Sequence, residues 1–192
     1  MFRNYDIVLL QETHLGKKNE NENEKKLGTK LEGEKESASG DYAWVCVEID
    51  NQKYTFVSVY YHSKESSNLM LRIVCSFLTQ GSAFFHMPVI GGDFNTTLDY
   101  ILDKDSTKDS AVHKTRRKSI LEIMKILDLQ DVWREKHPHE KVYTYSCKTP
   151  MSRLDYVFML EKDLPCVQNC DIWQDKELSD HYPVRLTLTM KH

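Results

Sequence analysis

The chain has 192 residues, of which 40% are hydrophobic and 29% are charged, and its formal net charge is −3. This length suits one domain with a substantial core, so we predict a single domain over residues 1–192. No apolar run approaches the roughly 20 residues needed to cross a bilayer, and residues 1–6 show no signal-peptide pattern. A sequence pI of about 6.2 excludes a chain-wide basic field, although a local patch for nucleic acid is still compatible with it.

Five cysteines, an odd number without paired Cys-x-x-Cys spacing, favour reduced thiols inside a cell. We therefore expect a nuclear or cytoplasmic protein with no membrane partner. Cys166 and Cys170 lack further His or Cys partners at the spacing of a zinc site, so we do not expect zinc there.

The first predicted element is a buried strand at residues 6–10, which ends beside Glu12. Taken alone, Glu12 is more simply a solvated loop acid. The following stretch, residues 17–40, contains twelve Lys or Glu among 24 residues. Such a composition buries too little apolar surface to offset chain entropy, so it predicts a mobile or disordered insert.

Residues 42–49 and 53–60 are rich in β-branched and aromatic side chains, and they predict a hairpin closed by a turn at 50–52. Tyr60 ends the second strand, where simple aromatic packing is the alternative to a functional role. Residues 67–78 have near-helical apolar spacing, which predicts an amphipathic helix that covers a sheet.

Residues 88–97 begin with a short apolar run, continue with two glycines and then present Asp93 and Asn95. This pattern predicts a buried strand that delivers an acid and an amide at its end. An extended backbone would point both side chains the same way, whereas a turn stabilised by the Asp and Asn side chains is the alternative. A buried carboxylate needs a partner or a metal, which makes Asp93 a candidate site residue.

A polar loop at 98–110 precedes a second predicted helix, which opens with the basic cluster at 113–118. Arg116, Arg117 and Lys118 are candidate phosphate contacts, and a solvated helix face is the alternative.

The last third of the chain contains two further acids near strands. Asp155 lies inside a predicted strand at 153–160, and Asp180 and His181 precede a strand that begins at Val184. The aromatic stretches at 132–133 and 143–145 are expected to pack. The chain contains no Gly-x-Ser-x-Gly, so it lacks the nucleophile elbow of a Ser–His–Asp hydrolase.

Each of these signals is weak alone, but their order across nearly the full chain is specific. The runs at 11–15, 91–96, 131–134, 143–145 and 152–156 resemble motifs of the endonuclease/exonuclease/phosphatase superfamily, which has the DNase I-like fold. They are most similar to the endonuclease domains of LINE-type retrotransposons.

The resemblance implies an α/β fold, a four-layer α/β/β/α sandwich of two packed mixed sheets, with the site where loops of both sheets meet. It also implies metal-dependent cleavage of phosphodiester bonds, with DNA as partner and Mg²⁺ or Mn²⁺ as cofactor; hard oxygen ligands suit these ions. The resemblance implies that Glu12 binds the metal and that Asp180 helps at a second position. It implies that Asp155 accepts a hydrogen bond from His181, and that Asp93 orients or activates water or protonates the leaving oxygen. Asn95 and Tyr60 would hold phosphate oxygens.

Some features depart from the superfamily pattern. The usual first strand, with an Asn at the site, has no room before residue 6, so we expect a domain truncated at its N-terminus. Residues 17–40 stand where a helix and strands are usual, and 61–62 are Tyr-His where Ala-Pro is usual. Three alternatives therefore stay open: an abasic-site endonuclease, a phosphatase for a small phosphoester, and an inactive relic that binds nucleic acid or protein.

Overall fold

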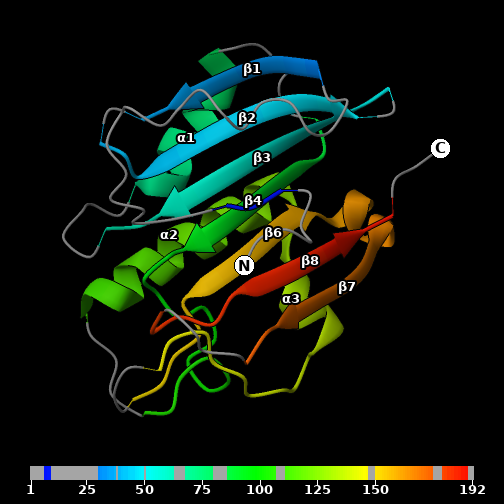
Figure 1. Ribbon diagram of the computed structural model, residues 1–192. Helices are drawn as coiled ribbons and strands as arrows, with labels where there is room; N and C mark the ends of the chain where they lie inside the picture. Colours follow the sequence, from blue (N-terminus) through cyan, green and yellow to red (C-terminus); the bar gives the residue numbers. More distant parts are fainter. Residues whose placement is uncertain are drawn as a thin grey trace.

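The computed structural model describes residues 7–9, 30–37, 39–49, 51–62, 68–79, 86–106, 111–146, 150–174 and 179–189. These residues form a six-stranded sheet in the order β1-β2-β3-β4-β6-β5 and a two-stranded sheet, β7-β8 (Figure 1). The strands are β1 (Lys30–Glu36), β2 (Tyr42–Ile49), β3 (Gln52–Tyr60), β4 (Pro88–Asp93), β5 (Leu129–Asp131), β6 (Asp155–Leu160), β7 (Val167–Ile172) and β8 (Val184–Leu188). The helices are α1 (Leu69–Thr79), α2 (Ala111–Leu127), α3 (Val132–Lys136) and the 3-10 helix η3 (Glu161–Cys166).

The larger sheet is apolar on both faces. Successive side chains of a strand point to opposite faces, and apolar residues occupy both sets of positions. In β3, Val57 and Val59 point into one cluster of buried side chains, and Tyr54 and Phe56 point into another. Only the β3–β4 pair is parallel within this sheet as described, and α1 makes the crossover between these two strands. The sheet must therefore be covered on both sides.

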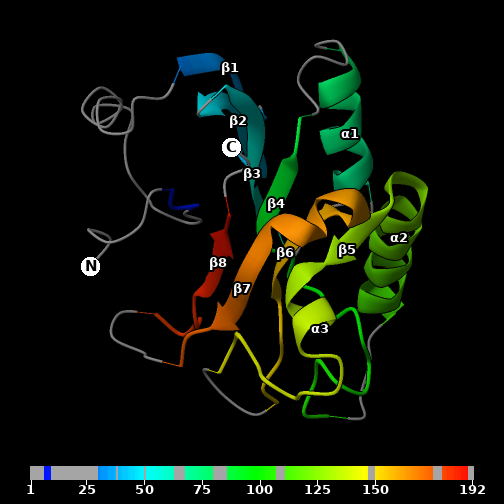
Figure 2. The ribbon, with the colours of Figure 1, turned by 90° about the vertical axis from the view of Figure 1, so that its right-hand side faces the viewer.

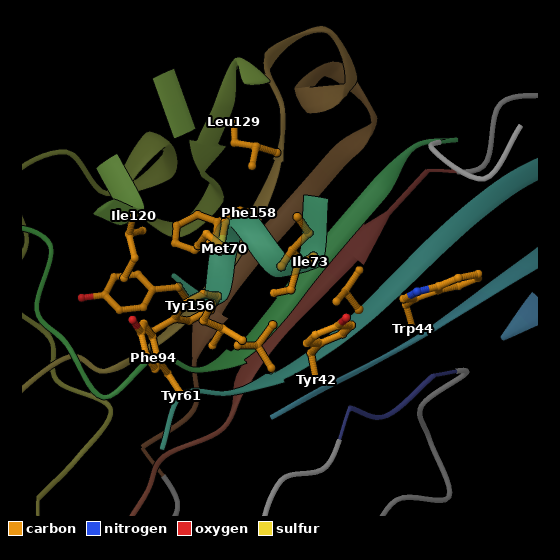
Figure 3. Close-up of a cluster of buried hydrophobic side chains, with 14 of the residues drawn as sticks. Tyr42, Trp44, Tyr61, Met70, Ile73, Phe94, Ile120, Leu129, Tyr156 and Phe158 are labelled. Atoms are coloured by element: carbon orange, nitrogen blue, oxygen red, sulfur yellow. The ribbon is translucent and has the colours of Figure 1, made fainter. Parts of the chain in front are cut away.

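Helices α1 and α2 cover one face (Figure 2). Met70 and Ile73 of α1 and Ile120 of α2 lie over the aromatic rings of Tyr156 and Phe158 (Figure 3). This confirms the amphipathic helix predicted at 67–78, which the structure places at Leu69–Thr79.

The two-stranded sheet covers the opposite face. Its side chains join Trp133 and Met159 in the second cluster, and both Cys166 and Cys170 are buried there as free thiols. Burial raises the pKa of the Cys170 thiol to about 12, as expected for an inert core cysteine. The predicted class, an α/β sandwich of two packed sheets, is confirmed. Within the described ranges, no helix layer covers the outer face of β7-β8.

Two predictions of local structure need correction. Residues 30–36 of the expected insert form strand β1, which pairs with β2 at the sheet edge. Charged side chains are common on edge strands because they discourage pairing with a further chain. Residues 7–9 carry no strand, although Leu9 packs against the second cluster. The predicted packing of residues 132–133 is confirmed, because Val132 and Trp133 are buried at the start of helix α3. Strand β7 was not predicted. Residues 17–29 lie outside the described residues.

No helix in the described ranges is both long and apolar enough to span a membrane.

Gly92 fixes the close approach of β3 and β4. Its φ of +143° lies in a region that favours glycine, and a Cβ there would stand 2.0 Å from the Val59 carbonyl oxygen. The second glycine of the 91–92 pair is therefore required by the backbone, directly before Asp93.

We predict that Gly92→Ala lowers the free energy of unfolding by about 3 kcal/mol or more, because the backbone conformation is strained and the new methyl group meets backbone. Urea denaturation measures this change. Gly40→Ala is the matched control: Gly40 also has positive φ (+69°), but no atom lies within 4 Å of the position that a Cβ would take there. It should cost only about 1 kcal/mol, and equal costs for the two variants would contradict the steric argument.

Candidate active site

Three neighbouring strands bring predicted site residues to one end of the larger sheet. Tyr60 is in register with Asp93 in the parallel β3–β4 pair, and Asp93 is in register with Asp155 in the antiparallel β4–β6 pair. By strand alternation all three share the face of Val89 and Val157, which line the cluster between the sheets. The carboxyl ends of β3 and β4 and the start of β6 thus build the floor of the candidate site.

Asp93 and Asn95 meet through a turn. The Asp93 carboxylate accepts hydrogen bonds from the Asn95 backbone N–H (2.7 Å) and from its side-chain amide (3.0 Å). Asn95 has a φ of 46°, so the expectation of an extended backbone is wrong here, and the turn interpretation describes the geometry. Asp93 is only 6% exposed, and Asn95 fixes the direction of both of its oxygens.

His181 and Asp155 form the hydrogen bond that the sequence predicted. The Nδ1 of His181 lies 2.8 Å from an oxygen of Asp155, and the His181 ring lies 5.0 Å from the ring of Tyr145. Burial lowers the pKa of His181, but the hydrogen bond and charge of Asp155, followed by the charges of Asp93 and Asp180, outweigh burial and raise this pKa to about 9.

A histidine with this pKa is a cation at neutral pH. Its Nδ1–H donates to Asp155, and its Nε2 carries a second N–H for which no described residue is the acceptor. The pair therefore presents a fixed, positively charged donor. Such a group suits the oxygens of a phosphate better than it suits the removal of a proton.

Thr144, which sequence reasoning treated as packing, holds the two halves of this pair together. Its hydroxyl accepts hydrogen bonds from the backbone N–H groups of Leu154 (2.9 Å) and Asp155 (3.0 Å). Its carbonyl accepts from the N–H of Tyr182, next to His181. A fully buried threonine between two tyrosines was the available signal, but its partners are remote in sequence.

Beneath the site lies a buried network of charges. Arg153 is 1% exposed and donates four hydrogen bonds, two to Asp103 (2.8 and 3.0 Å) and two to Asp131 (3.0 and 2.6 Å). Arg134 adds a 2.6 Å ion pair to Asp103. Burial raises the pKa of Asp103, but the charge and hydrogen bonds of Arg153, together with hydrogen bonds from the Asp99 N–H and Arg134, outweigh burial and lower this pKa below its usual range. Two motifs that the sequence flagged, at 131–134 and 152–156, therefore meet in this network.

The basic cluster has three different environments. Arg116 is 3% exposed, stacks on Tyr61 and donates to the carbonyl of His62, so a phosphate contact does not fit its burial. Arg117 donates to the Thr97 carbonyl at 2.6 Å. Lys118 is exposed and lies 3.8 Å from Glu122.

Only one of the two predicted metal ligands is among the described residues. Glu12 lies outside them, and Asp180 is exposed beside His181. The described ranges contain no cluster of three His, Cys, Asp or Glu side chains that would hold a metal ion. Tyr60 is half-buried, with its ring 5.7 Å from that of His62.

No protein-family model and no curated protein matches the chain. Among solved structures, it is similar to an AP endonuclease from Leishmania major, with a TM-score of 0.63 and 17% identity over 79% of this chain and 55% of that one. It is also similar to the endonuclease domain of TRAS1, a telomere-specific non-LTR retrotransposon (TM-score 0.60, 17% identity, 84% of this chain and 70% of that one).

An AP endonuclease from Archaeoglobus fulgidus gives a TM-score of 0.63 at 17% identity, over 84% of this chain and 72% of that one. The chain has the DNase I-like fold. At these identities the similarity establishes the DNase I-like fold alone, and the chain spans about half the length of the Leishmania protein.

We predict that Arg153→Met destabilises the protein by about 3–5 kcal/mol, because it leaves Asp103 and Asp131 buried without their shared cation. Urea denaturation at neutral pH measures the loss. Lys118→Met is the control, since an exposed pair of this kind contributes about 0–1 kcal/mol. A cost for Arg153→Met no larger than that of the control would show that the network is dispensable.

We also predict a pH signature for His181. A folded-state pKa above the unfolded value adds stability that is fully present below about pH 6.5 and is lost as pH rises through about 9. His181→Gln should therefore cost about 1–3 kcal/mol at pH 6 and clearly less at pH 10. Denaturation at both pH values measures this.

NMR titration of the His181 ring gives the matching direct test. Asp155→Asn should lower its pKa most, and Asp180→Asn, which acts through space, should lower it less. A wild-type pKa near the ordinary histidine value would contradict the assigned electrostatics.

Proposed function

We propose that this chain hydrolyses phosphodiester bonds and nicks DNA, in the manner of a LINE-type endonuclease. The observation that carries the proposal is the Asp155–His181 hydrogen bond, placed beside the register-matched Asp93 on the DNase I-like fold. The similarity to an AP endonuclease and to the endonuclease domain of a retrotransposon supports the choice of a nucleic-acid substrate.

The residues have distinct chemical tasks in this proposal. The His181 cation donates its Nε2–H to a non-bridging phosphate oxygen and stabilises the charge that builds up in the transition state. Asp93, aimed by Asn95, orients the attacking water or serves the leaving oxygen. Tyr60, at the end of the neighbouring strand, contacts the phosphate from the β3 side.

We propose Mg²⁺ or Mn²⁺ as cofactor, with Glu12 and Asp180 as ligands. The ion would act as a Lewis acid on the phosphate. Of these two ligands, only Asp180 is among the described residues, where it is exposed. The described residues contain no group of three His, Cys, Asp or Glu side chains that could hold the ion. In this proposal the protein's own side chains bind the phosphate, orient the water and serve the leaving oxygen.

A second candidate function is incision at abasic sites, favoured because two of the similar structures are AP endonucleases. The two activities share the chemistry and differ in the DNA that is recognised. A supercoiled plasmid with and without abasic sites separates them.

We predict that the wild-type chain converts supercoiled plasmid to the nicked form with Mg²⁺ and not with EDTA. Asp93→Asn and His181→Gln should each reduce the rate at least about a hundredfold, because each removes a group placed at the reacting phosphate. Glu12→Gln should abolish both nicking and the rise in melting temperature that Mg²⁺ produces.

The control is Lys162→Gln, an exposed lysine in η3, beyond the end of β6 opposite to Asp155. It should nick at the wild-type rate. Wild type that shows neither nicking nor a Mg²⁺ effect on melting would establish the inactive relic in place of the enzyme.

A further inference from the structure

The turn at residues 98–103 is unusually well supported for a surface segment. The Asp99 carboxylate accepts from the N–H groups of Ile101 (2.7 Å) and Leu102 (2.8 Å). Asp103 accepts from the Asp99 N–H and is itself held by the buried Arg153. These hydrogen bonds lead back to the network beneath the candidate site, so the conformation of the turn is fixed.

This rigid turn presents apolar side chains to solvent. Ile101 is 68% exposed and Tyr100 is 38% exposed, and Tyr100 lies 6.0 Å from the guanidinium of Arg117. A single exposed Ile needs no explanation by itself. Here the turn that carries it is held in one place by hydrogen bonds that reach the buried Arg153.

The outer face of helix α2 continues this surface with positive charge. Lys114, Arg117, Lys118 and Lys125 line an open depression together with Leu121 and one acid, Glu122. The net charge of this face is +3, on a chain whose formal net charge is −3. Its sign is therefore opposite to that of the molecule as a whole, which makes it complementary to a polyanion.

Helix α2 lies on the other face of the larger sheet from Asp93 and Asp155, and one of its cations reaches the loop that follows the site. Arg117 binds the carbonyl and the hydroxyl of Thr97 (2.6 and 3.1 Å), two residues after Asn95. Figure 2 shows α2 on the side of the larger sheet opposite to β7-β8. The loop that follows Asn95 is therefore the connection between the site and the cationic face of α2.

We propose that the 98–103 turn and the outer face of α2 form a contact surface for duplex DNA beside the scissile bond, with the α2 cations on backbone phosphates and Ile101 against the sugars and base edges of a groove. Apolar side chains of this kind pack into the minor groove and favour deformed duplex. The inference rests on the proposed function only for the choice of DNA as the polyanion.

Equilibrium binding, measured separately from nicking, tests the surface. The probe is a fluorescein-labelled duplex, followed by anisotropy in EDTA at several salt concentrations. Each phosphate contact contributes about 0.9 to the slope of log K against log salt, so Lys114→Gln with Lys118→Gln should reduce that slope by about 1.8. The charge-matched control is Lys53→Gln with Lys162→Gln, at the far end of the sheet, which should leave the slope unchanged.

The apolar contact has its own matched pair. Ile101→Ser should weaken duplex binding about fivefold to tenfold, because a partly buried Ile side chain is lost from the complex. Ile126→Ser is the control, since Ile126 is 74% exposed on the last turn of α2. It should bind like wild type.

Four outcomes would overturn the surface: wild type that does not bind duplex, an unchanged salt slope in the α2 double variant, an equal change in both double variants, or equal affinities for the two Ser variants. Wild type that shows the expected binding pattern but does not nick plasmid would refute the proposed hydrolysis and leave the contact surface standing.

Discussion

The arrangement of this protein's candidate site depends on one buried cation. Arg153 lies almost without solvent contact between two carboxylates from distant parts of the chain, Asp103 and Asp131. A charge in that position is tolerable only if its hydrogen bonds are satisfied. The loop after β4, the start of α3 and the start of β6 are consequently bound to one point, and Asp155 stands two residues from it.

The same point organises groups that carry no charge. The guanidinium lies 4.4 Å from the ring of Tyr156 and 5.0 Å from that of Trp133, so it joins the two hydrophobic clusters across the larger sheet. Asp131 also caps α3 by accepting from the N–H of Arg134. One residue thereby links a loop, a helix start, a strand start and the aromatic core.

Strands with strong local signals were predictable, and long-range partners were not. The hairpin of β2 and β3 and the strand before Asp93 follow from alternation and from glycine, which are local properties. Strand β1 was missed because its sequence, mostly Lys and Glu, lacks apolar alternation. The Asp155–His181 bond could be expected from motif order, but Thr144 and the partners of Arg153 are set by contacts between residues 10 to 50 positions apart. The burial of Arg116 likewise depends on Tyr61, on another element.

The Asp155–His181 bond also joins two sheets of unequal size. Asp155 begins β6 in the six-stranded sheet, whereas His181 precedes β8 in the two-stranded one. A two-stranded sheet is marginal by itself and depends on the surface that it covers. Any opening that detached β7-β8 from the larger sheet would separate the histidine from its carboxylate. The hydrogen-bonded pair therefore couples the docking of the smaller sheet to the geometry of the candidate site.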